Sequence, residues 1–357
     1  MSTFLYLISL SLLACVQNTP ATEEAKQPEE AKIFNNPILS RGADPWVLQK
    51  DGFYYYTQTN GRNIELRSTQ KMEDLSSSNP LIVWQPMENQ DYSKQIWAPE
   101  LHFLDGKWYL YFAATFDSGK ENSLNENRRM FVLENKSSSP MNQNWVLKGK
   151  IADATDHWAI DGTVLDMGEN KYFIWSGWRT FDHKSNTGRQ QLYIAKMVNP
   201  WSLEGERVMI SEPTYEWEKS GLVNEGPVIL KNKQGKIFLV YSASGCWTDE
   251  YKLGLLTLKE NANPLDPDAW TKHNTPVFTK NIENGVYAPG HNGFFKSPDG
   301  KEDWLLYHAN DNSGDGCGGK RSPRIQKFVW TSDGFPVFGK PEAVSEDLVA
   351  PSSEIHK

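Results

Sequence analysis

Three acidic residues stand at matching points of a repeated sequence pattern. Asp44 precedes a proline, Asp161 a glycine, and Glu225 a glycine followed by a proline, and each is followed by an apolar run typical of a β-strand. One such acid taken alone would most often cap a turn. Three of them in register within a repeat predict instead that the carboxyl groups converge on one site.

Converging carboxyl groups can hydrolyse a glycosidic bond. That reaction needs a protonated carboxyl group to donate to the leaving oxygen and an ionised one to activate water or attack the anomeric carbon. A third acid can keep the pKa of the donor high by charge repulsion. The sequence has no G-x-S-x-G motif and no histidines at metal-ligand spacing such as H-x-x-x-H. The acids therefore carry the predicted chemistry.

A repeat of five units must position these acids. Glu100 and His291 mark the other two copies, so the pattern recurs at intervals of roughly 60 residues, a period of the kind that radial repeats show. Each copy has room for the four short strands of a propeller blade. We predict an all-β, five-bladed β-propeller that forms a single domain over residues 35–345, with a polar tail at 346–357. Equivalent residues of the blades then point at one central axis.

The composition narrows the class of ligand. The chain has 357 residues, a net charge of −8 and 14 tryptophans. Its lysines and arginines are scattered, which argues against a nucleic-acid partner and favours a neutral or weakly charged substrate. Tryptophan suits the stacking of sugars, so Trp97 is a candidate for the funnel wall and Trp178 for its rim. Packing between blades is the alternative role.

The first 15 residues resemble the signal peptide of a bacterial lipoprotein. An apolar run from Phe4 ends at Cys15 in a pattern like the lipobox, whose cysteine is lipidated, although positions 2–14 contain no Lys or Arg. Residues 16–34 are polar and charge-rich, which is typical of a flexible tether. We predict an exported bacterial lipoprotein, anchored to the membrane through Cys15, in the periplasm or at the cell surface. A plain signal peptide is the alternative.

Two further cysteines, Cys246 and Cys317, form an even pair in an oxidising compartment. A disulfide between blades four and five is one outcome, and two reduced cysteines near the mouth of the funnel are the expected one. The glycine-rich stretch at 311–319 is interpreted as a flexible active-site loop, because neither a helix start nor the closing glutamate of a calcium loop follows it. One arginine after it could reach the funnel.

Together these motifs resemble glycoside hydrolase family 43, five-bladed propeller enzymes that act mainly on arabinose- and xylose-containing polysaccharides. The resemblance covers nearly all of residues 38–330, including an intact Trp-Ala-Pro element at Trp97. It implies that Asp44 is the general base, Asp161 the modulator of the pKa of the acid, and Glu225 the general acid.

The same resemblance implies two further roles. His291, in a Gly-His-Asn setting, would help to hold a water-coordinated Ca²⁺ or other ion in the central channel; a buried core histidine is the alternative. Arg324 would contact the substrate, against the alternative of an ordinary strand-edge arginine.

The family resemblance implies an inverting reaction, in which a water fits between the carboxyl groups of Asp44 and Glu225 at a separation of roughly 6.5–9.5 Å. We expect an exo-acting α-L-arabinofuranosidase that requires no cofactor beyond that channel ion and works as a monomer. A β-xylosidase and an endo-arabinanase are alternatives within the family. A non-catalytic, membrane-anchored glycan-binding propeller is the alternative outside it.

Overall fold

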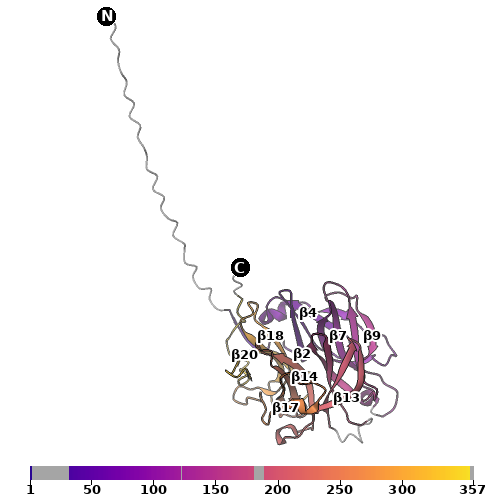
Figure 1. Cartoon of the computed structure of the whole chain (residues 1–357). Helices are drawn as coiled ribbons and strands as arrows, with labels where there is room; N and C mark the ends of the chain where they lie inside the picture. The colour runs from indigo at the N-terminus through magenta and orange to yellow at the C-terminus, as the bar shows by residue number, and fades with distance from the viewer. Residues whose placement is uncertain (2–31, 122, 181–188, 354–357) are drawn as a thin grey trace. The chain divides into compact units, whose positions relative to one another are not determined.

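A computed structural model describes residues 1, 32–121, 123–180 and 189–353 of the chain. The compact unit that begins at Ile33 contains five four-stranded antiparallel sheets (Figure 1). In every sheet the strands follow one another in chain order, and the first strands of neighbouring sheets contact each other. Each sheet is thus one blade, and its first strand is the innermost. The predicted all-β, five-bladed β-propeller is confirmed.

The blades take their strands in sequence. Blade one is β2 (Ala43–Lys50), β3 (Phe53–Thr59), β4 (Ile64–Thr69) and β5 (Leu81–Trp84). Blade two is β6 (Lys94–Leu104), β7 (Lys107–Thr115), β8 (Arg129–Asn135) and β9 (Val146–Lys150), and blade three is β10 (Ala159–Met167), β11 (Asn170–Gly177), β12 (Gln191–Asn199) and β13 (Ser202–Ser211). Blade four is β14 (Asn224–Lys231), β15 (Ile237–Ala243), β16 (Lys252–Leu258) and β17 (Trp270–Lys272), and blade five is β18 (Tyr287–Lys296), β19 (Asp303–Asn310), β20 (Ser322–Trp330) and β21 (Pro336–Val337). The described helices are short: η1 (Met72–Ser77), α1 (Ser123–Glu126), η2 (Glu216–Glu218) and η3 (Pro267–Ala269).

The apolar core is divided among the blade interfaces. Buried apolar side chains form five clusters, and each cluster lies between two adjacent blades, including blades five and one. Polar side chains such as Asp161, His291 and Asn292 are buried along the inner strands. A propeller built in this way gains its stability between blades and leaves its axis to polar groups.

A β-bulge recurs at the same point of all five inner strands. The pairing register shifts there, and one residue of each bulge has a positive φ: Asp44, Ala98, Asp161, Gly226 and His291. A bulge re-aims the side chains next to it. The left-handed conformation costs a non-glycine residue about 1–2 kcal/mol, and aspartate tolerates it better than most. The repeated motif seen in the sequence is therefore the bulge itself.

One glycine next to a predicted acid has a packing reason. A Cβ at Gly162 would lie 2.1 Å from Cζ of Phe173 on the neighbouring strand β11. Any side chain there would push Phe173 out of the interface between blades two and three, to which this ring belongs. Gly162 thus lets the bulge that carries Asp161 lie close to its own blade.

The N-terminal segment closes the ring onto blade five. Ile38 N–H donates to the carbonyl of Pro323 at 3.0 Å, and Gly42 N–H to that of Arg321 at 2.9 Å. β1 (Ile33–Phe34) also pairs with β22 (Leu348–Val349). The ordered unit therefore extends past both predicted boundaries, 35 and 345, because the chain ends complete the closure. Within the described residues, no helix is long and apolar enough to cross a membrane.

Candidate active site

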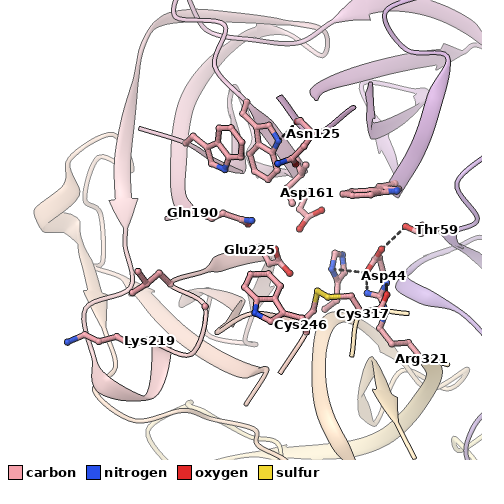
Figure 2. A pocket seen from close by; sticks show the side chains of 18 residues that line it. Asp44, Thr59, Asn125, Asp161, Gln190, Lys219, Glu225, Cys246, Cys317 and Arg321 are labelled. Atoms are coloured by element: carbon pink, nitrogen blue, oxygen red, sulfur yellow. Dashed lines mark hydrogen bonds and ion pairs between the residues drawn. A yellow bond between two sulfur atoms is a disulfide. The ribbon is translucent and has the colours of Figure 1, made fainter. Parts of the chain in front are cut away.

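A cavity of about 720 Å³ opens near the N-terminal ends of the inner strands. Every blade contributes at least one wall residue from its inner strand, and these include Asp44, Trp97, Asp161, Glu225 and His291. Figure 2 shows Asp44, Asp161 and Glu225 around the same opening. The fourth acid of the repeat does not join them, because Glu100 is buried and bonds to Nε2 of His102 at 2.9 Å. The structure thus brings the three predicted acids together.

Asp44 lies within a cluster of hydrogen-bond donors. Its Oδ1 accepts from Nη1 of Arg321 at 2.9 Å, and its Oδ2 accepts from Oγ1 of Thr59 at 2.7 Å. Nδ1 of His291 lies 3.5 Å from Oδ1, and Nδ1 of His308 lies 3.7 Å from it. Burial acts to raise the pKa of Asp44, but Arg321, aided by the hydroxyl of Thr59, holds that pKa well below its usual range. Asp44 is the carboxylate that stays ionised.

The two histidines are neutral neighbours at neutral pH. Burial is the main cause that lowers the pKa of both His291 and His308. The backbone N–H of Asp44 donates to Nδ1 of His308 at 3.0 Å, which requires that nitrogen to be an acceptor. Arg321 is consequently the permanent cation beside Asp44.

Glu225 has the opposite electrostatics. Burial raises its pKa to about 7; the hydrogen bond from Tyr251 opposes this rise, and the charge of Asp44 adds to it. Tyr251 OH donates to Oε1 of Glu225 at 2.8 Å. This ring is buried, and a Cβ at Gly290 would lie 2.3 Å from its Cε1. Glu225 therefore carries a proton at weakly acidic pH while Asp44 does not.

Asp161 links the other two acids. Burial raises its pKa well above the ordinary value, and the charges of Glu225 and Asp44 raise it further. The N–H of Gly226 donates to Oδ2 of Asp161 at 3.0 Å. Because that peptide directly follows Glu225, the bond holds the backbone next to Glu225 in place.

The two predicted tryptophans lie in the wall rather than at the rim. The guanidinium carbon of Arg128 lies 3.3 Å from the centroid of a Trp97 ring, so Arg128 covers one of its faces. Trp178 is only 2% exposed and stacks on Trp158 with centroids 4.7 Å apart. The indole N–H of Trp158 donates to the carbonyl of Asn125 at 2.8 Å. The expectation that Trp178 forms the rim is corrected, since this stack lies within the packing of blades two and three.

The arginine at the site is Arg321, and the expectation for Arg324 is corrected. Arg324 is completely buried, does not line the cavity and pairs with Asp311. Arg321 precedes β20, lines the cavity and bonds to Asp44. Strand alternation could not separate the two, because Arg321 lies in the loop before the strand begins.

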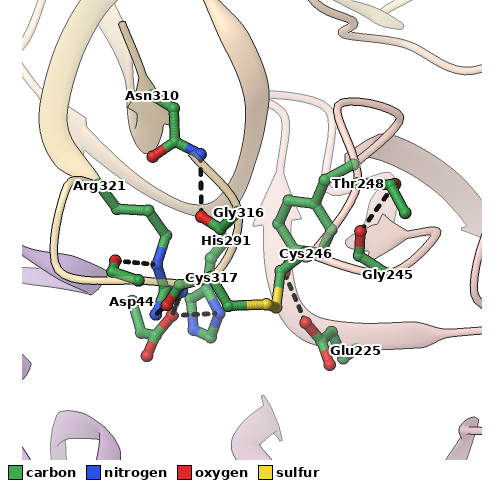
Figure 3. The surroundings of a disulfide bond; sticks show 12 residues. Asp44, Glu225, Gly245, Cys246, Thr248, His291, Asn310, Gly316, Cys317 and Arg321 are labelled. Carbon is green, nitrogen blue, oxygen red and sulfur yellow. Dashed lines mark hydrogen bonds and ion pairs between the residues drawn. A yellow bond between two sulfur atoms is a disulfide. The ribbon is translucent and has the colours of Figure 1, made fainter. Parts of the chain in front are cut away.

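Cys246 and Cys317 form a disulfide, with Cα atoms 5.1 Å apart (Figure 3). The expectation of two reduced cysteines near the funnel mouth is therefore wrong. Both cysteines line the cavity, and they join the segment after β15 in blade four to the β19–β20 loop in blade five. Their meeting depends on how these two blades pack, which sequence spacing does not reveal.

His291 meets Asp44 rather than a set of metal ligands. Among the described residues, no group of three or more His, Cys, Asp or Glu could hold a metal ion directly. Oδ1 of Asn292, next in the chain, is buried without a hydrogen-bond partner within the described structure. Ca²⁺ prefers such oxygen ligands and accepts waters. The residues thus fit an ion reached through water, and no step of the reaction is assigned to it.

Sequence reasoning missed several partners of the acids. Thr59 could have been found, because the Asp51-Gly52 turn sets the hairpin register that pairs Thr59 with Ala43, next to Asp44. Tyr251 and His308 carry no such signal. Tyr251 reaches Glu225 from the loop before β16 of the same blade, and His308 of blade five reaches Asp44 of blade one.

A family model described as glycosyl hydrolases family 43 matches residues 34–336. The extracellular exo-alpha-(1->5)-L-arabinofuranosidase of Streptomyces avermitilis is 39% identical over 94% of this chain and 69% of its own. Alpha-L-arabinofuranosidase 43 of Humicola insolens is 38% identical over 86% of this chain and 63% of its own. The chain thus spans about two thirds of the length of these two curated relatives. The crystal structure of an alpha-L-arabinofuranosidase from Lactobacillus brevis superposes with a TM-score of 0.80 at 36% identity, covering 88% of this chain and 98% of that one.

Replacing Arg321 with Gln should raise the pKa of Asp44, because it removes the cation bonded to this carboxylate. An opposite charge at this range lowers the pKa of an aspartate by about 1 to 3 pH units. We expect the acidic limb of the profile of kcat/KM against pH to move upward by that amount, measured on a nitrophenyl α-L-arabinofuranoside. Lys320→Gln is the matched control, because that neighbouring side chain is 70% exposed and pairs with Asp315. An acidic limb that stays in place in Arg321→Gln would refute the conclusion that Arg321 lowers the pKa of Asp44.

Proposed function

The chain belongs to the glycosyl hydrolases family 43, and from this premise we propose that it is an exo-acting α-L-arabinofuranosidase that inverts anomeric configuration. The observation that carries the proposal is the division of charge within one cavity. The pKa of Asp44 is held well below its usual range, whereas that of Glu225 is raised to about 7. Hydrolysis with inversion needs one ionised and one protonated carboxyl group.

Each of the three acids has its own role in the reaction. Glu225 donates its proton to the glycosidic oxygen, so the bond to the anomeric carbon breaks as the leaving sugar departs. Asp44 takes a proton from a water that attacks the anomeric carbon from the opposite face. Asp161 acts as the modulator of Glu225 by holding the Gly226 peptide directly after it, while burial and the charge of Asp44 raise the pKa of Glu225. When the products leave, Glu225 regains a proton and Asp44 loses one to solvent.

Arabinose is favoured over xylose by the relatives. The curated relatives at 38–39% identity are named arabinofuranosidases, and so is the protein in the structure with a TM-score of 0.80. A glycan-binding propeller without activity would have no need for two carboxyl groups with pKa values driven apart. The Streptomyces avermitilis relative is named an exo-alpha-(1->5)-L-arabinofuranosidase, which supports release of terminal arabinose from an α-1,5-linked chain.

Export, anchoring and the channel ion are further parts of the proposal. The same Streptomyces relative is named extracellular, which supports export. The lipidation expected at Cys15 falls outside the described residues, and the lipobox-like sequence before it is its support. The unpartnered Asn292 oxygen supports an ion, such as Ca²⁺, reached through water near His291.

Glu225→Gln tests the proton donor. A general acid contributes about 10²- to 10⁴-fold, so we expect kcat on an α-1,5-linked arabinobiose to fall by that factor. A dinitrophenyl arabinofuranoside, whose leaving group needs no proton, should lose far less. In the wild type, the alkaline limb of the pH profile near pH 7 reports deprotonation of Glu225. This limb should be absent when the dinitrophenyl arabinofuranoside is the substrate.

The control for this variant is Glu216→Gln, whose side chain is 90% exposed. It should match the wild type on both substrates. Equal losses on the two substrates in Glu225→Gln would contradict the role of proton donor, and inactivity of the wild type on both would contradict the proposed substrate.

A further inference from the structure

Trp247 presents an exposed indole ring at the cavity. Its surface is 57% exposed, although it is one of the residues that line the cavity. Trp97, Trp158 and Trp178 in the same wall are all more deeply buried. A single exposed aromatic residue needs no functional reason, but the ring of Trp247 is also held in a fixed position.

The backbones of two glycines lie against the indole ring of Trp247. A Cβ at Gly245 would lie 2.4 Å from Cε2 of Trp247, and one at Gly221 would lie 2.8 Å from Cζ2. The N–H of Gly245 also donates to the carbonyl of Ser220, which joins the two supporting segments. The residue before the ring, Cys246, is tied to blade five by the disulfide. One face of the indole thus rests on a fixed backbone, and the exposed area belongs to the rest of the ring.

The platform lies on the side of the proton donor. Gly221 and Leu222 line the cavity and lead directly into β14, which carries Glu225. The proton of Glu225 goes to the glycosidic oxygen, so the leaving sugar starts at Glu225 and extends toward this part of the wall. The terminal arabinose, whose anomeric carbon the water attacks, lies instead between Glu225 and Asp44.

We propose that Trp247 is the binding platform for the leaving-group pentose, the second sugar ring of an arabinose-containing chain. This inference rests on the proposed function and specifies a part of its substrate site. An aromatic face offers a sugar ring a large apolar contact. Because the ring is already immobilised by Gly221, Gly245 and the disulfide, stacking costs little side-chain entropy.

The test compares two ligands on Trp247→Ala in the full chain. For α-1,5-linked L-arabinobiose, which occupies both positions, we expect kcat/KM to fall about 3- to 10-fold. For free L-arabinose, a product inhibitor that fills the position at the three acids, Ki should be unchanged. Trp247→Phe should recover most of the lost kcat/KM. Phe53→Ala, an exposed aromatic residue that does not line the cavity, is the control and should match the wild type.

The outcomes separate the platform from the proposed function. An unchanged kcat/KM in Trp247→Ala, or a weakening of arabinose inhibition equal to the loss on arabinobiose, would overturn the platform alone. Wild-type protein that leaves arabinobiose uncut would overturn the proposed substrate and the platform with it.

A separate observation concerns the disulfide and the cation of the site. Arg321 Nη2 donates to the carbonyl of Cys317 at 2.7 Å, while Nη1 of the same guanidinium bonds to Asp44 at 2.9 Å. The loop that carries Cys317 contains glycines at 314, 316, 318 and 319, and besides the disulfide it is held by hydrogen bonds from Gly314 N–H to Asp249 and from Asn310 to the carbonyl of Gly316. The cross-link to Cys246 fixes the carbonyl that orients the guanidinium (Figure 3).

We infer that the Cys246–Cys317 disulfide is a positioning element for Arg321 and, through it, for the charge of Asp44. The groups that also face Asp44 come from five other elements, namely Thr59, Asp161, Glu225, His291 and His308. None of these depends on the cross-linked loop for its backbone, because they lie on β3, β10, β14, β18 and β19. Loss of the disulfide should therefore weaken the Arg321 contribution specifically.

Dithiothreitol tests this on the folded full chain. It transfers two electrons and two protons to the disulfide, which yields two thiols while the reagent closes to its own cyclic disulfide. We expect the acidic limb of kcat/KM to move upward by about 1 pH unit, in the same direction as in Arg321→Gln but by less. The double variant Cys246→Ser/Cys317→Ser should show the same shift without the reagent. A fixed acidic limb, with two free thiols confirmed by titration, would overturn the inference, since a purely structural cross-link lowers the melting temperature without moving the limb.

Discussion

The ion pair between Arg321 and Asp44 is the interaction on which the site depends. Three carboxyl groups share one buried cavity, where burial and mutual repulsion favour protonation of all three. The guanidinium at 2.9 Å reverses this preference for Asp44. Asp44 then contributes the negative charge that helps to keep the protons on Asp161 and Glu225. One cation thus sets the division of roles among three similar side chains.

The propeller makes this arrangement possible at a cost that other parts of the fold offset. Asp44 and Asp161 both adopt the left-handed conformation, which costs each about 1–2 kcal/mol. Five apolar clusters between the blades supply the stability that tolerates this strain. Because the five apolar clusters of the described residues all lie between blades, the bulged ends of the inner strands can present polar side chains to one cavity.

The fold and the three acids of the site could be predicted from the sequence because a local, repeated motif indicates both. Each copy carries its own bulge, its acid or its histidine, and its strand, so the motif around Asp44 or Glu225 needs no knowledge of the rest of the chain. Arg321, Tyr251 and the disulfide partners were not predictable in this way. They lie in loops between strands, and they meet their partners through the tertiary packing of blades four, five and one, which no local pattern encodes. The choice of Arg324 failed for the same reason.

The stereochemistry of the first product tests the central claim most directly. Proton NMR can follow the anomeric signals of arabinose released from an α-L-arabinofuranoside before mutarotation mixes the anomers. If ionised Asp44 activates a water while protonated Glu225 assists the leaving group, the β-anomer appears first. Initial release of the α-anomer would show that a carboxylate attacks the sugar itself, and it would contradict the roles assigned to Asp44 and Glu225.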